Sequence, residues 1–547
     1  MAMLNQAQNN AKKSSFYGAA TIIALGTFLS RILGLVREQV FAYFFGAGMF
    51  TDAFLIAFRI PNLLRDLFAE GAMSSALVPV YTKARHDNGE DYAWRLASNV
   101  IQWLALVLGL IALIGMLFAE PLVRIYAPAF AQIPGKHELT VAMTRIMWPF
   151  LPLVVMAAVW MGLLNARDKY TTPSMAPSMF NIASILSAFF LCPLMPKFFG
   201  VHPIYGMAIG VIIGGLGQWL IQWGTLRGEG FRFTWGMRPR DPELHRIVWL
   251  MGAGTFGLAA TQVNILVNSM MASSQGDGPV SWLNYAFRLM QFPIGVFGVA
   301  ISTATLTRIS REVAANDMES VRKSVVNSLR MVLVLTIPSS VGLAVLGVPI
   351  ISVIYEHGRF HGTDSYATAM ALACYAVGLS AYSAIKVLVP IFYSLGKSKV
   401  AILSSGLSVL MNVTMCFLLV HTWGFKGLAF ATSVAALANC GVLLVMIQVY
   451  AQKIDFSNLG KCLFATLASS LLMAMVLVIG LKMAGIDLFQ PVSEQSYWYH
   501  AGFSGRFSFL CLALGLGIAT YIACAKAFGL QEIQDLLGLV KRRYFRS

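Results

Sequence analysis

The feature that most constrains this chain is a series of fourteen apolar segments, each long enough to cross a lipid bilayer. A membrane-spanning helix needs about 20 apolar residues, and these runs are long and do not alternate between polar and apolar positions. We therefore predict an all-α polytopic membrane protein rather than a barrel. The predicted spans are 17–45, 52–82, 95–119, 139–166, 172–196, 203–226, 246–273, 279–307, 322–355, 366–394, 400–420, 427–451, 460–484 and 506–530.

The composition agrees with this class. Of 547 residues, 57% are hydrophobic and only 12% are charged, against about 25% charged residues in soluble domains. The formal net charge of +16 would suggest nucleic acid in a soluble protein. Here we assign it to basic cytoplasmic loops and intramembrane arginines, so no nucleic-acid partner is expected. Residues 1–15 lack the apolar core of a signal peptide, so we expect no cleavage there.

Lysine and arginine are concentrated in the loops that follow even-numbered spans, which predicts that both termini are cytoplasmic. Pro239 and Pro242 lie in the most basic of these loops, which is the expected boundary between two halves. The expected organisation is a cytoplasmic N-terminal segment (1–16), an N-terminal six-span lobe (17–226), a basic cytoplasmic linker (227–245), a C-terminal six-span lobe (246–451), spans thirteen and fourteen (452–530) and a basic cytoplasmic tail (531–547).

Short similar sequences recur in the two halves of the chain. Ala-Phe-Arg occurs at 57–59 and again at 286–288, an offset of 229 residues. Gly-Ala-Ala-Thr at 18–21 is echoed by Gly-Ala-Gly-Thr at 252–255. Because six spans separate the echoes, both halves start on the same side of the membrane. This predicts a parallel repeat, with a pseudo-two-fold axis along the membrane normal, as in many transporters.

The stretch from Ser30 to Glu70 is strongly apolar, yet it carries eight charged side chains. A charge in the bilayer core costs at least a few kcal/mol, so such residues usually face a cavity or a partner. Arg31 and Glu38 are seven residues apart and share a helix face, as do Arg59 and Asp66 in the next span. These charges predict either an intramembrane site for an anion or static ion pairs.

Arg288, in the eighth span, has no acidic neighbour in its own helix, since Phe287 and Gln291 flank it. An intramembrane arginine without an acidic neighbour in its own helix indicates an anion supplied from elsewhere. The planar guanidinium suits phosphate, because it donates two parallel hydrogen bonds. We therefore expect Arg31, Arg37 and Arg288 to bind an anionic ligand rather than to form static pairs.

Three segments carry a resemblance to a known family. They read SRILGLVREQVFAYFFGAG, TDAFLIAFRIPNLLRDLFAEGAMSSALVPV and SWLNYAFRLMQFPIGVFGVA. The chain resembles the MurJ (MviN) family of lipid II flippases through span fourteen. That resemblance implies the fold of the multidrug/oligosaccharidyl-lipid/polysaccharide exporter superfamily, with 14 transmembrane helices in two six-helix lobes plus two C-terminal helices. It also implies transport of undecaprenyl-pyrophosphate-linked peptidoglycan precursor from the inner to the outer leaflet of the bacterial cytoplasmic membrane.

The resemblance also implies particular site residues. The family's essential arginines fall on Arg31, Arg37, Arg65 and Arg288, and Ser30, Glu38, Asp52 and Arg59 belong to the same substrate-binding set. An outer gate would pair Glu70 with Lys386 of span ten. Spans thirteen and fourteen would form a groove for the lipid tail. Lipid II and membrane lipids are the implied partners, with other cell-wall synthesis proteins as further candidates, and a monomer is expected.

No cofactor is expected, but ion coupling is open. Some family members bind sodium in the C-terminal lobe, and the matching positions are Asn268, Asn412, Cys416 and Thr432. The acidic ligands of those members are absent at the first and third positions, and hard cations prefer carboxylate oxygens. Sodium and the membrane potential therefore both remain as expected driving forces, with the potential favoured.

Three other classes of protein compete with this interpretation. A drug or polysaccharide-lipid exporter of the same superfamily would have fewer arginines in its first span. A membrane-embedded enzyme would need clustered carboxylates with a metal, or a nucleophilic histidine, but all eight histidines lie in or near predicted loops. A structural scaffold would gain little from intramembrane charges. The seven cysteines form no Cys-x-x-Cys pair, so neither a metal site nor a disulfide framework is expected.

Overall fold

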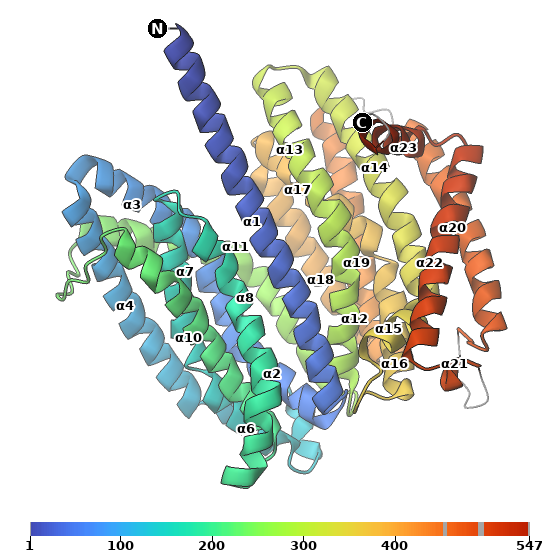
Figure 1. The fold of residues 1–547 in the computed structure, drawn as a ribbon, viewed down its shortest axis with the longest axis horizontal. Helices are drawn as coiled ribbons and strands as arrows, with labels where there is room; N and C mark the ends of the chain where they lie inside the picture. Colours follow the sequence, from blue (N-terminus) through green and yellow to red (C-terminus); the bar gives the residue numbers. More distant parts are fainter. Residues whose placement is uncertain (1, 452–456, 489, 491–496, 545–547) are drawn as a thin grey trace. The chain divides into compact units, whose positions relative to one another are not determined.

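The computed structural model describes residues 2–451, 457–488, 490 and 497–544, with the side chains of 2–20, 69–72, 74–75, 253–261, 451, 497, 536 and 539–544 left out. The described chain is helical and contains no β-strand (Figure 1). It divides into two compact units, Met1–Gln262 (unit 1) and Val263–Ser547 (unit 2). The boundary lies inside a helix, some residues after the linker expected at 227–245.

Unit 1 begins with a 44-residue helix and continues through shorter ones. Its elements are α1 (Ala2–Phe45), α2 (Met49–Arg65), η1 (Asp66–Met73), α3 (Ser74–Asn88), α4 (Glu90–Leu117), α5 (Ala119–Tyr126), η2 (Pro128–Gln132), α6 (Lys136–Met147), α7 (Phe150–Asn165), α8 (Thr171–Leu186), η3 (Ser187–Leu191), α9 (Cys192–Leu194), η4 (Met195–Phe199), α10 (Ile204–Gly228) and the first part of α11 (Pro242–Ser273).

Unit 2 contains the remainder of α11 and the following elements. They are α12 (Pro279–Pro293), η5 (Ile294–Gly298), α13 (Val299–Ala314), α14 (Met318–Val345), α15 (Gly347–Tyr355), α16 (Gly362–Ala376), α17 (Leu379–Ser394), α18 (Ser398–Trp423), α19 (Phe425–Ala451), α20 (Ser457–Met483), α21 (Tyr497–His500), α22 (Phe503–Ala527) and α23 (Gln531–Tyr544). Its core is aliphatic, with Ile309, Val325, Leu388 and Leu443 packed together.

Ten helical segments of the described residues are long and apolar enough to cross a membrane, or eleven if the bent pair α16–α17 counts as one. They coincide with eleven of the predicted spans. The predicted spans at 17–45, 52–82 and 246–273 fall on α1, on the continuous α2–η1–α3 and on α11, whose side chains are only partly described. The multi-pass helical architecture is therefore confirmed, while the count of fourteen stays a prediction.

Small residues let α1 approach α8 closely. Gly26, Ser30 and Gly34 recur every four residues, a spacing that allows membrane helices to pack backbone against backbone. A Cβ at Gly26 would lie 2.7 Å from Cβ of Ser174 on α8. Asn181 Nδ2 donates a hydrogen bond of 3.0 Å to the backbone oxygen of Ser30. This contact orients the charged part of α1 within unit 1.

The same order of elements occurs in both units at the offset of 229 residues. The offset places α5 (119–126) on 348–355, and α15 occupies 347–355. It places α7 (150–165) on 379–394, which are the bounds of α17. Both α2 and α12 continue into π-helical turns, η1 and η5, at matching positions. The order of elements thus repeats at this offset, while the parallel relation of the two halves stays a prediction. The side chains of 18–20 and 253–255 lie outside the described part.

Candidate functional site

The charged face of α1 carries two arginines in different surroundings. Arg31 is exposed, and no carboxylate within the described part of the chain pairs with it. Arg37 is half-buried, and its Nη2 lies 2.5 Å from Oε1 of Glu38. The Arg37 guanidinium also lies over the ring of Phe180 on α8, 5.3 Å from its centroid. Arg37 is therefore oriented by two neighbours, whereas Arg31 is presented on the surface of its helix.

The second cationic group lies at the end of α2. Nη2 and Nε of Arg65 lie 2.5 Å and 3.1 Å from Oδ1 of Asp66, and both side chains stay partly exposed. The two side chains therefore form an ion pair, which is one of the two alternatives that the sequence leaves open for these charges. Arg59 is half-buried one and a half turns earlier. Glu70 lies in η1, but its side chain falls outside the described residues.

Asp52 is placed differently from the other predicted site residues. Its Oδ2 lies 3.0 Å from Nζ of Lys136 on α6, and both side chains are 0% exposed. Lys136 also lies 4.1 Å from the ring centroid of Phe130. Lys136 lies outside the predicted spans, so sequence reasoning missed this pair. The signal available was Asp52 itself, which has no basic residue one turn away on its own helix and therefore needs a cation from elsewhere.

Unit 2 contributes two exposed cations from the predicted set. Arg288 is exposed on α12, at the position that the repeat offset matches to Arg59 of α2. Lys386 is exposed on α17, and its backbone oxygen accepts a hydrogen bond of 2.5 Å from Oγ of Ser302 on α13. Neither has an acidic residue one turn away on its own helix. Unit 2 thus presents far fewer charges on these helices than unit 1.

The positions matched to a sodium site form a cluster of amides. Nδ2 of Asn412 donates to Oδ1 of Asn264 at 2.5 Å and to Oδ1 of Asn268 at 3.1 Å. Cys416 Sγ donates to the same Asn268 oxygen at 3.2 Å, and the hydroxyl of Thr432 donates to its own helix at Leu428. Asn412 Oδ1 is buried without a hydrogen-bond partner among the described residues.

This amide cluster does not fit a cation. Two of its three amide oxygens already accept hydrogen bonds from inside the cluster, and it has no carboxylate to balance a positive charge. The described residues also contain no group of three or more His, Cys, Asp or Glu side chains that could bind a metal. The hydrogen bonds of the cluster join α11 to α18.

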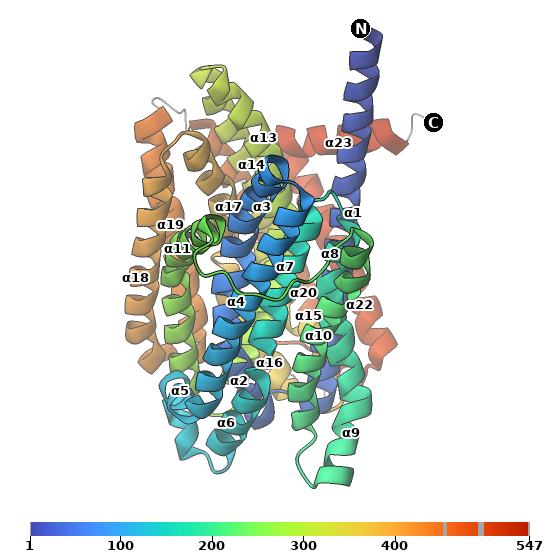
Figure 2. The same cartoon turned by 90° about the vertical axis from the view of Figure 1, so that its left-hand side faces the viewer.

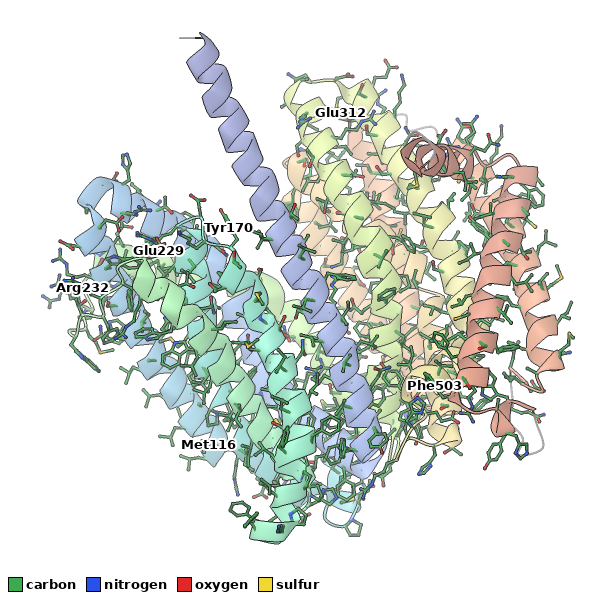
Figure 3. The ribbon with its side chains drawn as sticks, in the orientation of Figure 1. Met116, Tyr170, Glu229, Arg232, Glu312 and Phe503 are labelled. Carbon is green, nitrogen blue, oxygen red and sulfur yellow. The ribbon has the colours of Figure 1, made fainter. Side chains whose placement is uncertain are left out.

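A second charged cluster, which the sequence did not predict, joins three loops at one end of unit 1. Arg167 lies 2.7 Å from Glu90 and 3.1 Å from Glu229, and Lys169 lies 3.0 Å from Glu229. The Arg167 guanidinium also lies over the ring of Trp94, at 4.8 Å. Hydrogen bonds from Lys169 and Arg167 lower the pKa of the Glu229 carboxyl below its ordinary value. Figure 3 places Glu229 and Tyr170 at this end, with Met116 towards the other end of α4.

The sequence matches a known protein family over most of its length. A sequence model of the family described as lipid II flippase MurJ matches residues 41–494. A probable lipid II flippase MurJ from Vibrio cholerae is 33% identical over 525 residues, covering 94% of this chain and 96% of the relative. Lipid II flippase MurJ from Burkholderia cenocepacia is also 33% identical, over 77% of this chain and 81% of that protein.

Solved structures with a similar fold include a member of the same family. Lipid II flippase MurJ in an inward closed conformation matches with a TM-score of 0.75 and 25% identity, over 94% of this chain and 100% of that chain. A multidrug resistance MATE family transporter matches with a TM-score of 0.66 at 12% identity, over 80% of this chain and 99% of that chain. The second similarity shows a shared fold alone.

Proposed function

The chain belongs to the lipid II flippase MurJ family, and from that premise we propose that it moves lipid II from the inner to the outer leaflet of a bacterial cytoplasmic membrane. Such a protein is a transporter rather than an enzyme, and it serves peptidoglycan synthesis. Its substrate is an undecaprenyl-pyrophosphate-linked precursor, which combines a strongly anionic pyrophosphate with an apolar tail. The anionic part cannot cross hydrocarbon unaided, because burying an unpaired charge is very costly.

The observation that carries this proposal is the set of arginines on apolar helices. Arg31 and Arg288 are exposed, and Arg37 and Arg65 are partly exposed with one carboxylate neighbour each. We propose that these four bind the pyrophosphate in a cationic cavity, with Ser30, Glu38 and Arg59 nearby. Paired carboxylates such as Glu38 and Asp66 can release an arginine when a more strongly charged anion arrives. Because Asp52 is buried against Lys136, we assign it a positioning role instead of substrate contact.

Transport by alternating access is part of the proposal, with the membrane potential as driving force. The amide cluster around Asn412 argues against sodium in this chain, as it lacks a carboxylate. Moving one charge through the full potential is worth about 2.3 kcal/mol per 100 mV, so a charged headgroup or gate can couple to it. The proposed topology has fourteen spans and both termini in the cytoplasm, and α20 and α22 would accommodate the lipid tail. The transporter is proposed to act as a monomer.

Glu70 and Lys386 are proposed to form a gate that closes during transport. Lys386 is exposed on its helix, and Glu70 lies in the π-helical segment η1, where backbone geometry departs from a regular helix. A partly hydrated ion pair is worth about 1 kcal/mol or less, which is weak enough to open. In a variant without the native cysteines, a Glu70→Cys/Lys386→Cys disulfide should block transport until it is reduced. Efficient cross-linking with full transport would contradict the gate.

The experiment that tests the function is depletion of the resident flippase in a bacterium that carries this chain as its only replacement. Lipid II exposed at the outer leaflet is measured with an externally added enzyme that cannot enter the cell. We expect exposure to continue with the native chain and to stop with Arg37→Ala at an equal level in the membrane. Loss of exposure with the native chain, when it is present and folded, would contradict the proposal.

A further inference from the structure

Residues 229–241, which join α10 to α11, form an extended strap bound to α4. Oγ of Ser98 accepts from the backbone N–H of Thr234 at 3.2 Å, and Asn99 Oδ1 accepts from the N–H of Arg238 at 2.9 Å. Gln102 donates to the oxygen of Thr234 at 2.9 Å and accepts from the N–H of Gly236 at 3.1 Å. Three buried polar side chains of α4 therefore form the hydrogen bonds to the strap backbone that a neighbouring strand would form in a sheet.

The strap residues beside the bonded ones are large, apolar and exposed. The backbone bonds to α4 involve residues 234, 236 and 238. The residues next to them are Phe233, Trp235 and Met237, with exposed fractions of 37%, 87% and 39%. The rings of Phe233 and Trp235 meet edge to face, with centroids 5.0 Å apart. A fixed row of apolar side chains that faces outward needs an apolar or amphipathic environment to be stable.

The position of the strap along α4 identifies that environment. The first turns of α4 carry Glu90, Asp91 and Arg95, which belong in water or at a headgroup layer. Further along α4, the side chains on the same face as Asn99 and Gln102 are apolar and exposed, as expected of a surface in contact with lipid. They are Leu106, Leu110, Leu113 and Leu117. The strap lies between the two regions, at the level of the membrane–water interface, where tryptophan is enriched. Figure 2 shows it as the thin green trace that crosses unit 1 at α4.

The charge of the strap fits the same environment. Arg232, Arg238 and Arg240 are all exposed, and Figure 3 shows Arg232 at the loop end of unit 1. The two acidic residues of this segment are engaged elsewhere. Glu229 is paired with Arg167 and Lys169, and Asp241 accepts from the Tyr92 hydroxyl at 3.3 Å. The outward face is therefore aromatic and cationic, the combination that interfacial membrane anchors use.

We propose that the strap is a membrane-interface anchor, in which Phe233, Trp235 and Met237 enter the headgroup layer and the three arginines bind anionic phospholipid. This rests on the membrane orientation of unit 1 but not on which substrate the chain transports. Each arginine near an anionic surface contributes about 1 kcal/mol, which corresponds to roughly a fivefold change in affinity.

The first test measures lipid retention. The purified full chain is titrated with dioleoyl-phosphatidylglycerol in detergent, and bound lipids are counted by native mass spectrometry. Arg232→Gln/Arg238→Gln/Arg240→Gln should reduce affinity for this lipid by at least fivefold, with phosphatidylcholine unaffected. The control, Arg308→Gln/Arg311→Gln/Lys323→Gln, removes the same charge from exposed positions in unit 2. Equal losses in the two variants would mean that net charge alone binds lipid and would overturn the proposal.

The second test measures depth in the bilayer and does not depend on charge. A nitroxide is attached at Met237→Cys or at Met318→Cys, in a chain without its native cysteines and in nanodiscs that contain phosphatidylglycerol. The two methionines are similarly exposed, at 39% and 37%, but Asp317 and Glu319 flank the second. The label at 237 should collide with lipid-dissolved oxygen and the label at 318 with a water-soluble nickel complex. Equal access of nickel to both labels would overturn the anchor.

Discussion

Within each unit, equivalent pairs of helices pack together, but the side chains at their contacts differ in chemistry. In unit 1, α2 contacts α6 through the buried ion pair of Asp52 and Lys136. The repeat offset places these positions on Ser281 and Ser365 of α12 and α16, which also pack together and where both serines are buried. The Ser365 hydroxyl donates instead to Glu356, at 2.6 Å. At these two positions the helix pair of unit 2 therefore packs without an ion pair. A hydrogen bond of 3.0 Å from Nε1 of Trp282 on α12 to the buried carboxylate of Asp364 on α16 joins its helices.

A second equivalent contact also differs between the two units. In unit 1, α1 meets α8 through small residues and one hydrogen bond, from Asn181 to the backbone of Ser30. In unit 2, α11 meets α18 through the amide cluster around Asn412. Most of the charged residues in the predicted site lie in unit 1. The contact between α11 and α18 in unit 2 is formed by neutral amide groups. The helices thus repeat in the two units, while the side chains at their contacts differ.

The largest expected effect on folding comes from breaking the buried pair. Lys136→Ala leaves the Asp52 carboxylate buried and unpaired, which costs about 3–5 kcal/mol of unfolding free energy. Asp52→Ser/Lys136→Ser copies unit 2 and should recover most of that loss, because no charge remains. The thermal unfolding midpoint of the detergent-solubilised chain measures both. A double variant as unstable as Lys136→Ala would show that the two helix pairs are not equivalent.

The amide cluster should show the next largest effect. Asn412→Ala leaves the side-chain oxygens of Asn264 and Asn268 without their shared donor, which costs about 1–3 kcal/mol. Ser404→Ala on the same helix removes only a bond to its own backbone, at Ala401, and should cost less. Sodium chloride and potassium chloride should give the same unfolding midpoint for the native chain. A sodium-specific rise, as bound ligand produces, would contradict our assignment of the cluster.

The close approach of α1 to α8 can be tested with two glycines of the same helix. A Cβ at Gly26 would lie 2.7 Å from Ser174, whereas a Cβ at Gly34 would lie 3.8 Å from Asn181. Gly26→Ala should therefore destabilise unit 1 by about 1–3 kcal/mol through overpacking. Gly34→Ala has ordinary contact distances and should be nearly neutral. Equal unfolding midpoints for the two variants would argue that the helices can move apart at no cost.

The smallest expected effect belongs to the loop cluster at Glu229. This carboxylate lies at the surface with 20% of its side chain exposed, so solvent partly screens its pairs and Glu229→Gln should cost about 1 kcal/mol or less. Because folding lowers the pKa of Glu229, its stabilisation is present above the ordinary glutamate pKa and is lost as pH falls through the lowered value. The unfolding midpoints of variant and native chain should therefore differ at neutral pH and converge in acid. A difference that grew in acid would have the wrong sign.

Much of the fold could be predicted from the sequence, because long apolar runs bounded by basic loops leave few alternatives. The spans predicted at 203–226 and 400–420 match α10 and α18 to within three residues at each end. The span predicted at 322–355 is instead two helices, α14 and α15, separated at Leu346. Hydropathy does not report such a break, because apolar residues continue on both sides of it.

The candidate site could be predicted only where partners are close in sequence. Arg65 and Asp66 are adjacent, so an ion pair between them was one of the alternatives that the sequence offered, and it is present. The pair of Asp52 and Lys136 spans 84 residues, so only tertiary packing brings it together. The binding of the strap to α4 is likewise formed by residues more than 130 positions apart. Helix periodicity indicates which residues share a face, but it does not say which helix that face meets.

The central proposal is that cations from both units bind one pyrophosphate. These cations are Arg31, Arg37 and Arg65 of unit 1 and Arg288 of unit 2. The most direct test is the dissociation constant of the purified chain for lipid II, compared with Arg288→Ala, Arg288→Lys and the exposed control Arg311→Ala. A hydrogen bond to a charged group is worth about 1.5–3 kcal/mol, so Arg288→Ala should weaken binding by roughly tenfold or more. Lysine should restore only part of it, because it lacks the two-pronged guanidinium. Native affinity in Arg288→Ala would contradict the claim and leave the substrate to unit 1 alone.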